Sequence, residues 1–402
     1  MKKLLTLAAT AALGLASLAA TAQAITVDGQ ITTAEVSTTG YTLVGRYTGA
    51  HGFAPSATNS AGILSLYAAA DANNLYFFVV GTLQNDGNPA TISNSLQLLV
   101  ARPGITTVPV GTVLPKPAAA SVNTSFQNFA PYLDQVGDMG IGIKGNGTAA
   151  QVQVDGIVYT SATAATAAVL SGTTGLAATG TTAAVSGQTG SLTVFNGAQV
   201  AYRTSTSLNA NPGYGNNTST VPAYGLEVSV SRASIGLPAA GGTVRVFALQ
   251  NNADGGYVSS DFIPQNTVAL PTTSFPNAPN LGTNPDFRLV PGTQSAALTV
   301  GATTGVTVLA TKAADAAAVA LSVYPNPVAD AASVAYRVTD QASPVSIVLT
   351  DLLGRPVRVL ENSLKPVGSQ SVALDKSNLA AGTYLVRVQV GEKVSTSKIA
   401  VR

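Results

Sequence analysis

The feature that most constrains the fold is a recurring pattern of short apolar, β-branched runs, each closed by turn-forming residues. Toward the C-terminus these runs read SVAYRV, VSIVLTD, SVAL and YLVRVQV. Such runs of about four to eight residues predict β-strands, and Asp340, Gly354 and Gly368 between them predict turns. We therefore expect residues 321–402 to form a small immunoglobulin-like β-sandwich of about six or seven strands.

Residues 25–300 show the same pattern on a larger scale. The stretch LYAAADANNLYFF predicts a β-hairpin that turns at Asp71–Asn74. Further strands are expected at residues 95–102, 224–236 and 241–251. The chain is therefore expected to be all-β, with one large, jelly-roll-like β-sandwich domain over residues 25–300. Residues 301–320 are expected to supply a final strand and a short linker.

Residues 151–190 are harder to interpret. The run QVQVDGIVYT at residues 151–160 alternates cleanly and is expected to turn at Asp155–Gly156. Residues 160–190 are rich in Ala, Gly and Thr, which is compatible with a short helix and loop, two weak strands or a surface insertion. The alanine content favours a short helix near Ala162–Leu170, followed by irregular chain.

The N-terminal residues have the pattern of a secretory signal peptide. Two lysines, Lys2 and Lys3, precede a long apolar stretch, and Ala22-Gln23-Ala24 has the A-x-A form of a signal peptidase site. We expect residues 1–24 to be removed, which leaves a mature chain that starts near Ile25 in the periplasm. No later stretch reaches the roughly 18 apolar residues that a spanning helix needs, so we do not expect a transmembrane protein.

Composition excludes several kinds of chemistry. The chain has no cysteine, which excludes disulfides, thiolate metal sites and cysteine catalysis. Residues 25–320 carry nine Lys and Arg against twelve Asp and Glu, a net charge of −3, whereas residues 321–402 carry nine against six, a net charge of +3. With no basic stripe in the larger domain, nucleic acid is not an expected partner.

Catalytic side chains are sparse. His51 is the one histidine in the sequence, and it lies in a glycine-flanked loop, where a lone histidine is usually a surface residue. One histidine with scattered acids cannot build a zinc site. Glu35 and Glu227 are the glutamates of residues 25–320. The alternation around Glu227 predicts a solvent-facing side chain. We therefore expect a protein that is not an enzyme.

A structural calcium is the one bound ion that the sequence leaves open, because calcium takes oxygen ligands from loops. Asp134 and Asp138 lie close together in PYLDQVGDMGIG, but no EF-hand pattern is present. Asp also favours turns through hydrogen bonds to its own local backbone, which explains these residues without a metal. No other cofactor is expected.

Aromatic residues offer the one candidate ligand site. Tyr41, Tyr47 and Phe53 lie close together in sequence, with Arg46 and His51 among them. Such rings can stack on the apolar face of a sugar, so these three residues are the candidate glycan-binding residues. The alternative is that the rings pack in the core or on a sheet surface.

Residues 321–402 carry an ordered set of motifs. These are Tyr324-Pro325-Asn326-Pro327, then Asp351-Leu352-Leu353-Gly354-Arg355, then Leu379-Ala380-Ala381-Gly382-Thr383-Tyr384, and last a basic tail with Lys393, Lys398 and Arg402. In this order they resemble the type A C-terminal sorting domain of the type IX secretion system, the outer-membrane export route of Bacteroidota. The resemblance assigns the sorting motif to Pro325, Asn326, Pro327, Asp351, Gly354, Gly382, Tyr384 and Lys398.

This resemblance implies an address. It implies export through the periplasm and the outer membrane by the type IX machinery. It also implies that a sortase removes the domain and joins the rest of the chain to surface lipopolysaccharide. The expected location is therefore secreted, on the outer cell surface.

Several segments of residues 25–300 are similar to secreted β-sandwiches related to DOMON domains and family 9 carbohydrate-binding modules. They are the opening ITVDGQI, the LYAAADANNLYFFVVG hairpin, the GLEVSVSRASIGL strand and the closing Asn280-Leu281-Gly282 with Asp286-Phe287. The resemblance implies a sandwich with a glycan-binding role. However, family 9 modules clamp sugar between tryptophans, and this chain has none. Two functions remain: a structural or binding module at the surface, or an adhesive module that recognises a polysaccharide.

Overall fold

The computed structural model describes most of the chain between Ile25 and Arg402. The described residues are 25–36, 40–47, 49, 51, 61–84, 94–118, 123–148, 150–170, 175–214, 222–264, 280–290, 294–303, 305–309, 319–339, 342–351, 356–377, 379–390 and 393–402. The signal-peptide region 1–24 and the predicted site residues Phe53 and Gly354 lie outside these ranges. Within them, no helix is long and apolar enough to cross a membrane.

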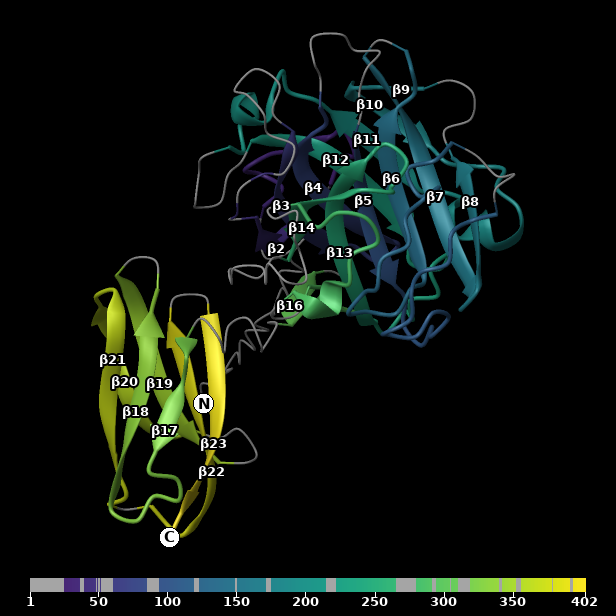
Figure 1. Cartoon of the computed structure of the whole chain (residues 1–402). Coiled ribbons are helices and arrows are strands. Elements are labelled where there is room, and N and C mark those ends of the chain that lie inside the picture. The colour runs from purple at the N-terminus through teal and green to yellow at the C-terminus, as the bar shows by residue number, and fades with distance from the viewer. Residues whose placement is uncertain are drawn as a thin grey trace, which may run out of the picture.

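The described residues form β-strands that gather into two bodies, as Figure 1 shows. The first body, here called the cargo domain, runs from β1 to β16, and the second, here called the sorting domain, runs from β17 to β23. The prediction of an all-β, sandwich-like chain is confirmed.

The first cargo sheet has the order β10-β11-β12-β4-β3-β2, with β1 paired to β12. Its strands are β1 (Gln30–Ile31), β2 (Thr42–Arg46), β3 (Gly62–Ala70), β4 (Asn74–Thr82), β10 (Thr179–Ala184), β11 (Gln199–Arg203) and β12 (Ala223–Ser231). All strand pairs in this sheet are antiparallel.

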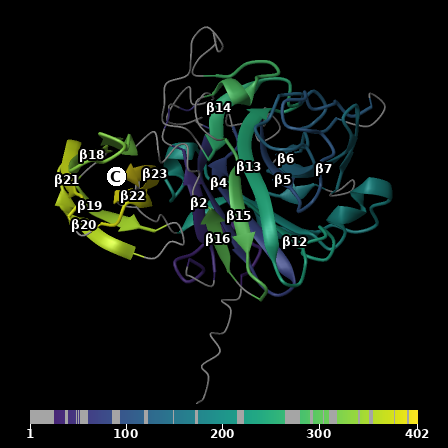
Figure 2. The same cartoon turned by 90° about the horizontal axis from the view of Figure 1, so that it is seen from below.

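The second cargo sheet has the order β16-β15-β13-β5-β6-β7-β8, with β14 paired to β13 and β9 paired to β7. Its strands are β5 (Asn94–Ala101), β6 (Met139–Gly145), β7 (Gln151–Ser161), β8 (Ala164–Val169), β9 (Leu176–Ala177), β13 (Gly242–Asn252), β14 (Val258–Ile263), β15 (Ala296–Val300) and β16 (Val306–Leu309). Figure 2 shows β13, β15 and β16 side by side on one flank of the cargo domain. The final strand expected within residues 301–320 is β16.

Apolar side chains from the facing sides of both sheets fill the central core. Leu66 and Phe77 come from the first sheet, and Leu98 and Val246 from the second, and all are almost fully buried. Both sheets are also covered on their outer sides. One cover contains Tyr41 and Phe78, and the other is a cluster of phenylalanines. Because both faces are buried, the central strands lose the plain alternation of a half-exposed sheet.

The predicted hairpin is confirmed as β3 and β4. Asp71 explains the turn, because its Oδ1 accepts hydrogen bonds from the backbone N–H groups of Asn73 and Asn74, both at 2.7 Å. Tyr76 OH donates to Oδ2 of the same carboxylate, also at 2.7 Å. These bonds to the charged carboxylate lower the pKa of Asp71 although partial burial opposes them.

Two predictions within residues 151–190 are wrong. Asp155–Gly156 is not a turn, because β7 runs through it without a break and pairs with β6 and β8 on either side. A Cβ at Gly156 would lie 2.7 Å from Leu170 and 2.8 Å from Phe195, so glycine here makes room for core side chains.

The short helix expected near Ala162–Leu170 is instead strand β8, hydrogen-bonded to β7. Backbone pairing with a neighbouring strand has overridden the helical preference of alanine. The described residues include three 3-10 helices: η2 (Gly190–Phe195), η3 (Leu208–Ala210) and η4 (Phe287–Leu289).

The sorting domain is a small sandwich of two sheets, with orders β17-β18-β21 and β20-β19-β22-β23. Its strands are β17 (Ser322–Tyr324), β18 (Ala331–Val338), β19 (Ser343–Thr350), β20 (Pro356–Lys365), β21 (Gly368–Asp375), β22 (Gly382–Val390) and β23 (Lys393–Val401). Its core contains Val334, Ile347, Leu374 and Val388, each fully buried. The described strands match the predicted number.

Candidate functional site

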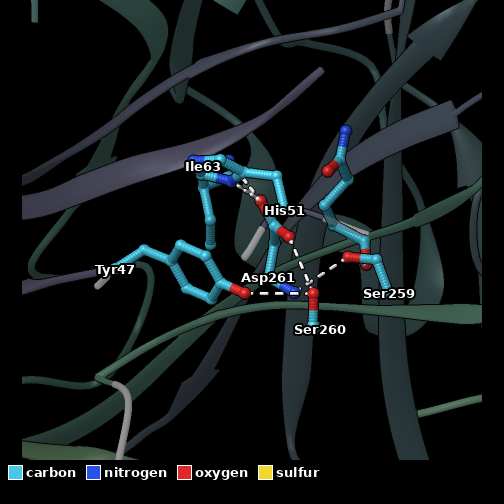
Figure 3. Close-up of polar contacts among 7 residues, drawn as sticks. Tyr47, His51, Ile63, Ser259, Ser260 and Asp261 are labelled. Carbon is cyan, nitrogen blue, oxygen red and sulfur yellow. Dashed lines mark hydrogen bonds and ion pairs between the residues drawn. The ribbon is translucent and has the colours of Figure 1, made fainter. Parts of the chain in front are cut away.

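A polar cluster of the cargo domain surrounds His51 and Asp261, which Figure 3 shows in close-up. Asp261 lies on β14 and is fully buried, while the side chain of His51 keeps 14% exposure. Nδ1 of His51 lies 2.5 Å from Oδ2 of Asp261. The same carboxylate oxygen accepts a hydrogen bond from the backbone N–H of Ile63 at 3.1 Å. A buried carboxylate needs such partners, because burial without them is costly.

A second chain of hydroxyl groups reaches the same carboxylate. Tyr47 OH donates to Oγ of Ser260 at 3.0 Å, and Ser260 Oγ donates to Oδ1 of Asp261 at 3.2 Å. The rings of Tyr47 and His51 lie 4.8 Å apart between centroids. Figure 3 shows the hydroxyl group of Tyr47 pointing to Ser260, beside Asp261. Both oxygens of Asp261 are therefore engaged.

Gly62 provides the space for this cluster at the start of β3. A Cβ there would lie 2.6 Å from Oδ2 of Asp261 and 2.6 Å from Nδ1 of His51. A real Cβ contact is longer than this, so any side chain at this position would displace the pair. The cluster thus joins β14 of the second sheet to β3 of the first, at one corner of the sandwich.

The chemistry of the pair follows from its geometry. In a neutral imidazole, Nδ1–H donates to Asp261, which fixes the tautomer and leaves the lone pair on Nε2. This arrangement can orient an imidazole for a proton transfer or a ligand, as carboxylate–histidine pairs do in many sites. No group of three or more His, Asp or Glu side chains that could hold a metal ion occurs among the described residues.

The interpretation of His51 as a plain surface residue is therefore wrong. Its partner Asp261 is 210 positions away in the sequence, on a strand for which no local signal indicated a polar role. Only the pairing of β14 with β13, and its approach to β3, brings the two residues together. The strand itself reads VSSDFI, in which two serines precede Asp261, so no pattern of the sequence linked this acid to His51.

A second buried polar site surrounds Glu227 on β12. The predicted solvent-facing position is wrong, because Glu227 has 0% exposure. Oε1 accepts a hydrogen bond from Tyr41 OH at 2.7 Å, and Oε2 accepts from the backbone N–H groups of Asp28 and Gly29 at 2.8 and 2.9 Å. The N-terminal segment covers the outer side of this sheet. Side chains on both faces of β12 are therefore buried, and alternation along the strand does not mark a solvent-facing side.

Burial raises the pKa of Glu227 to about 8, although the three hydrogen bonds to its oxygens lower it. Burial also raises the pKa of Tyr41, with the neighbouring charge of Glu227 adding to the shift. Together these contacts fasten the Asp28–Gly29 turn to the middle of the sheet. The function of this acid is therefore to hold the start of the domain in place.

The candidate glycan-binding residues do not form an open platform. Tyr41 is 1% exposed in the outer cluster beside Phe78, and Tyr47 is 8% exposed in the central core. The two rings thus serve different buried clusters, and Phe53 lies outside the described residues. Neither described ring offers a free face to a sugar.

The acids considered for calcium have protein partners. Oδ2 of Asp134 accepts from the backbone N–H groups of Gln294 and Ser295, at 2.6 and 3.1 Å. Asp138 is fully buried and forms a two-pronged ion pair with Arg102, the closest contact being 2.6 Å. Local and long-range hydrogen bonding explains both carboxylates.

The sorting motif has a structural explanation at Asn326. Its Oδ1 accepts from the backbone N–H of Ala400 at 2.9 Å, and its Nδ2 donates to the backbone oxygen of Lys398 at 3.0 Å. Next to it, Val328 N–H donates to Ala400 O at 2.8 Å, and Arg402 N–H donates to Val328 O at 3.0 Å. The Asn326 side chain thus extends a strand-like pairing along the edge of β23.

The other motif residues support the same sheet. Gly382 begins β22 opposite Val401, and Tyr384 packs against the core while its OH donates to Ala380 O at 2.8 Å. The remaining described motif residues lie at the surface or half-buried: Pro325 and Pro327 beside Asn326, Asp351 after β19, and Lys398 on β23. The described motif residues are spread over the ends of β17, β19 and β22 and over β23, and do not converge on one cluster.

Comparison with known families agrees with the resemblance of this segment. Residues 322–402 match the family described as the secretion system C-terminal sorting domain. A domain of this family implies secretion by the type IX system and association with the outer surface of the cell. The match covers only this segment, so the similarity of residues 25–300 to DOMON and family 9 carbohydrate-binding modules stays a prediction. A search of the curated proteins finds no match to the chain.

Three solved structures show distant likeness. The first is the BSP domain of a biofilm-associated protein, with 8% identity and a TM-score of 0.16 over 87% of this chain and 53% of that one. The second is dimeric latent PorU from Porphyromonas gingivalis, with 12% identity and a TM-score of 0.17 over 86% of this chain and 34% of that one. The third is PorZ from the same organism, a surface component of its type IX secretion system, with 15% identity and a TM-score of 0.16 over 89% of this chain and 47% of that one. The chain spans about a third to a half of the length of these proteins. At such TM-scores these likenesses establish neither fold nor function.

Proposed function

We propose that this protein is a type IX secretion substrate whose cargo domain is a non-catalytic β-sandwich module with a structural role at the outer cell surface. The observation that carries the proposal is the sorting-family match of residues 322–402, together with the folded sandwich that those residues form. The cargo domain is the part delivered, and the sorting domain is the part that directs its delivery.

The buried rings favour a structural role over glycan recognition. Tyr41 and Tyr47 each donate a hydrogen bond to another interior side chain, and each is less than 10% exposed. A platform for sugar stacking needs an exposed ring face. A cargo domain that turns its polar groups and rings inward is suited to persist as a rigid surface element.

The route of the chain is part of the proposal. Residues 1–24 act as the signal peptide, and the chain crosses the periplasm before outer-membrane export. A sortase then removes the sorting domain within or after the linker, and the cargo domain is joined to surface lipopolysaccharide. Surface material should therefore start near Ile25 and lack the peptide LAAGTYLVRV in mass spectrometry.

The decisive experiment removes residues 321–402 and measures where the chain accumulates in a bacterium with a type IX system. The truncated chain should be found in the periplasm, while the full chain reaches the surface. A full chain with a substitution at the partly exposed residue Asp286 is the control for handling of a mutant protein. Surface display of the truncated chain would exclude the proposed function.

The structural role has a separate test. The full chain is applied to a glycan array, and no specific binding is expected. Binding that disappears in Tyr47→Ala, without a change in melting temperature, would replace the structural role with a polysaccharide-recognition role.

A further inference from the structure

The edge strand β20 of the sorting domain has an inverted pattern of side chains. In an antiparallel pair, residues opposite each other share one face of the sheet. Ile347 and Leu349 of β19 point into the core, yet their partners on β20 are Glu361 and Arg358. On the outward face the order is reversed, because Val348 pairs with Val359. The strand thus places polar side chains inward and apolar ones outward, opposite to the usual arrangement.

The outward apolar side chains are strongly exposed. Val357, Val359 and Leu364 are 44%, 60% and 68% exposed, and Val367, in the turn that follows, is 53% exposed. These four residues define what we call the β20 patch. They are four of the nine large, exposed hydrophobic side chains of the described residues. A cluster of this kind on one strand marks an interaction surface.

The strand that carries the β20 patch is held firmly in place. Leu360, at the bulge between the paired residues, packs against the core of the sorting domain. The guanidinium of Arg358 donates to the backbone oxygen of Asp375 at 2.6 Å and to that of Ser377. These contacts tie β20 to the opposite sheet, so the apolar face is presented outward by the fold itself.

The charge around the β20 patch indicates the kind of partner. Arg387 of β22 is exposed and pairs with Val348, so it lies on the same outer face. Lys398 of β23 is also exposed and pairs with Leu385 on that face. The sorting domain as a whole carries a net charge of +3. The outer face therefore runs from an apolar edge to a basic side.

We infer that the β20 patch is the surface by which the sorting domain docks on a protein of the secretion apparatus, one that presents an apolar surface with an acidic rim. The inference rests on the proposed function, because a sorting domain must be bound by the apparatus that reads it. Apolar side chains at the centre of the contact supply affinity, and complementary charge at the rim supplies orientation.

The test uses the full chain with Val359→Lys and Leu364→Lys together, in a bacterium with a type IX system. The matched control is Val110→Lys with Val113→Lys, which alters two exposed valines of the cargo domain. We expect the amount of the double β20 variant at the cell surface to fall by about tenfold or more, because two central contacts are lost. The variant should accumulate in the periplasm instead. The control should be exported like the unchanged chain.

The outcomes separate this inference from the proposed function. If the chain without residues 321–402 is retained but the double β20 variant is exported normally, the docking surface is wrong and the sorting role stands. If the truncated chain is also exported, the proposed function itself fails.

Two further measurements address the folding of the double variant and the self-association of the chain. The purified double variant should have the same melting temperature as the unchanged chain. If its melting temperature falls, the export assay is repeated with Val359→Thr and Leu364→Thr together, because threonine is a good strand former. Reduced export of that variant is then the expected result, and normal export would overturn the inference. Sedimentation of the purified full chain tests self-association. A dimer that the double variant abolishes would mean that a second copy occupies the patch, which would overturn the inference.

Discussion

The two domains treat polar and apolar side chains in opposite ways. The cargo domain buries ionisable groups deeply, among them Glu227 and Asp261, and satisfies them with long-range hydrogen bonds. Among the described residues of the sorting domain, Ser395 is the buried polar residue, while Val359 and Leu364 face the solvent. The cargo domain thus satisfies its buried ionisable groups internally, whereas the sorting domain places several exposed apolar side chains on one strand and the turn after it, the kind of surface that other proteins bind. This difference is what we would expect if the proposed roles of the two domains are right, with the cargo domain as a structural module and the sorting domain as the part that is bound.

The largest expected effect concerns the buried pair of the cargo domain. Asp261→Ala leaves the Ile63 N–H and the Ser260 hydroxyl without their acceptor and His51 without its partner, so we expect the free energy of unfolding to fall by about 3 kcal/mol. Chemical denaturation of the purified chain measures it. The matched control is Asp286→Ala, which removes a partly exposed ion pair with Arg288 and the cap of η4, and should cost about 1 kcal/mol or less. If both substitutions lowered the free energy of unfolding by the same amount, the buried acid would contribute no more to stability than the acid near the surface.

The next prediction concerns pH. The folded pKa of Glu227 is raised to about 8 from 4.5, so the folded state holds a proton that the unfolded state releases. The stability that this proton contributes is complete below pH 4.5 and is lost as pH rises through 8. We expect the cargo domain to lose about 2 kcal/mol between pH 5 and pH 8, within the limit of about 1.4 kcal/mol per pH unit. Glu227→Gln should flatten this dependence in unfolding curves; an unchanged slope would assign it to other groups.

A smaller effect is expected at the edge of the sorting domain. Asn326→Ala removes two side-chain hydrogen bonds to the backbone of β23, and we expect a loss of about 1 kcal/mol in the unfolding of that domain. Asn362→Ala, at an exposed position of β20, is the control and should change stability by less than about 0.5 kcal/mol. Amide hydrogen exchange along β23 should accelerate only in the first variant. If both variants behave alike, Asn326 has no role in closing the edge.

The smallest effect is expected on the β20 patch. Leu364→Ser should leave stability unchanged within about 0.5 kcal/mol, because the side chain is 68% exposed. Ile347→Ala, on the neighbouring strand but fully buried, should cost about 2–5 kcal/mol. Thermal unfolding of the two variants compares them directly. A large loss of stability in Leu364→Ser would show that the β20 patch packs within the folded chain. The sorting domain would then no longer differ from the cargo domain in this respect.

Sequence reasoning predicted the parts of the fold that depend on neighbours in the chain. The β3–β4 hairpin was predictable because Asp71 organises its turn from within four residues. The sandwich of the sorting domain was predictable because its strands alternate and its turns carry turn formers. In these segments, local pattern and final structure agree, as they do wherever short-range bonds determine the conformation.

The misses share a different cause, which is contact between distant segments. Asp155–Gly156 looks like a turn, but β6 and β8 pair on both sides of it and hold it extended. Glu227 looks solvent-facing, but the N-terminal segment covers it from 199 positions away in the sequence. His51 and Asp261 form a site only after β14 has joined the second sheet. A local sequence pattern cannot predict these contacts, because they depend on the order of the strands in the sheets.

The bond between Asp28 and Glu227 also has a consequence in time. Because the chain is proposed to be exported with a signal peptide, Asp28 enters the periplasm before Glu227, which follows 199 positions later. Until Glu227 has followed, the Asp28–Gly29 turn lacks its acceptor, so the first part of the domain to cross the inner membrane cannot make its final contacts at once. The N-terminal segment of the domain therefore stays unattached until the segment that carries β12 has followed it.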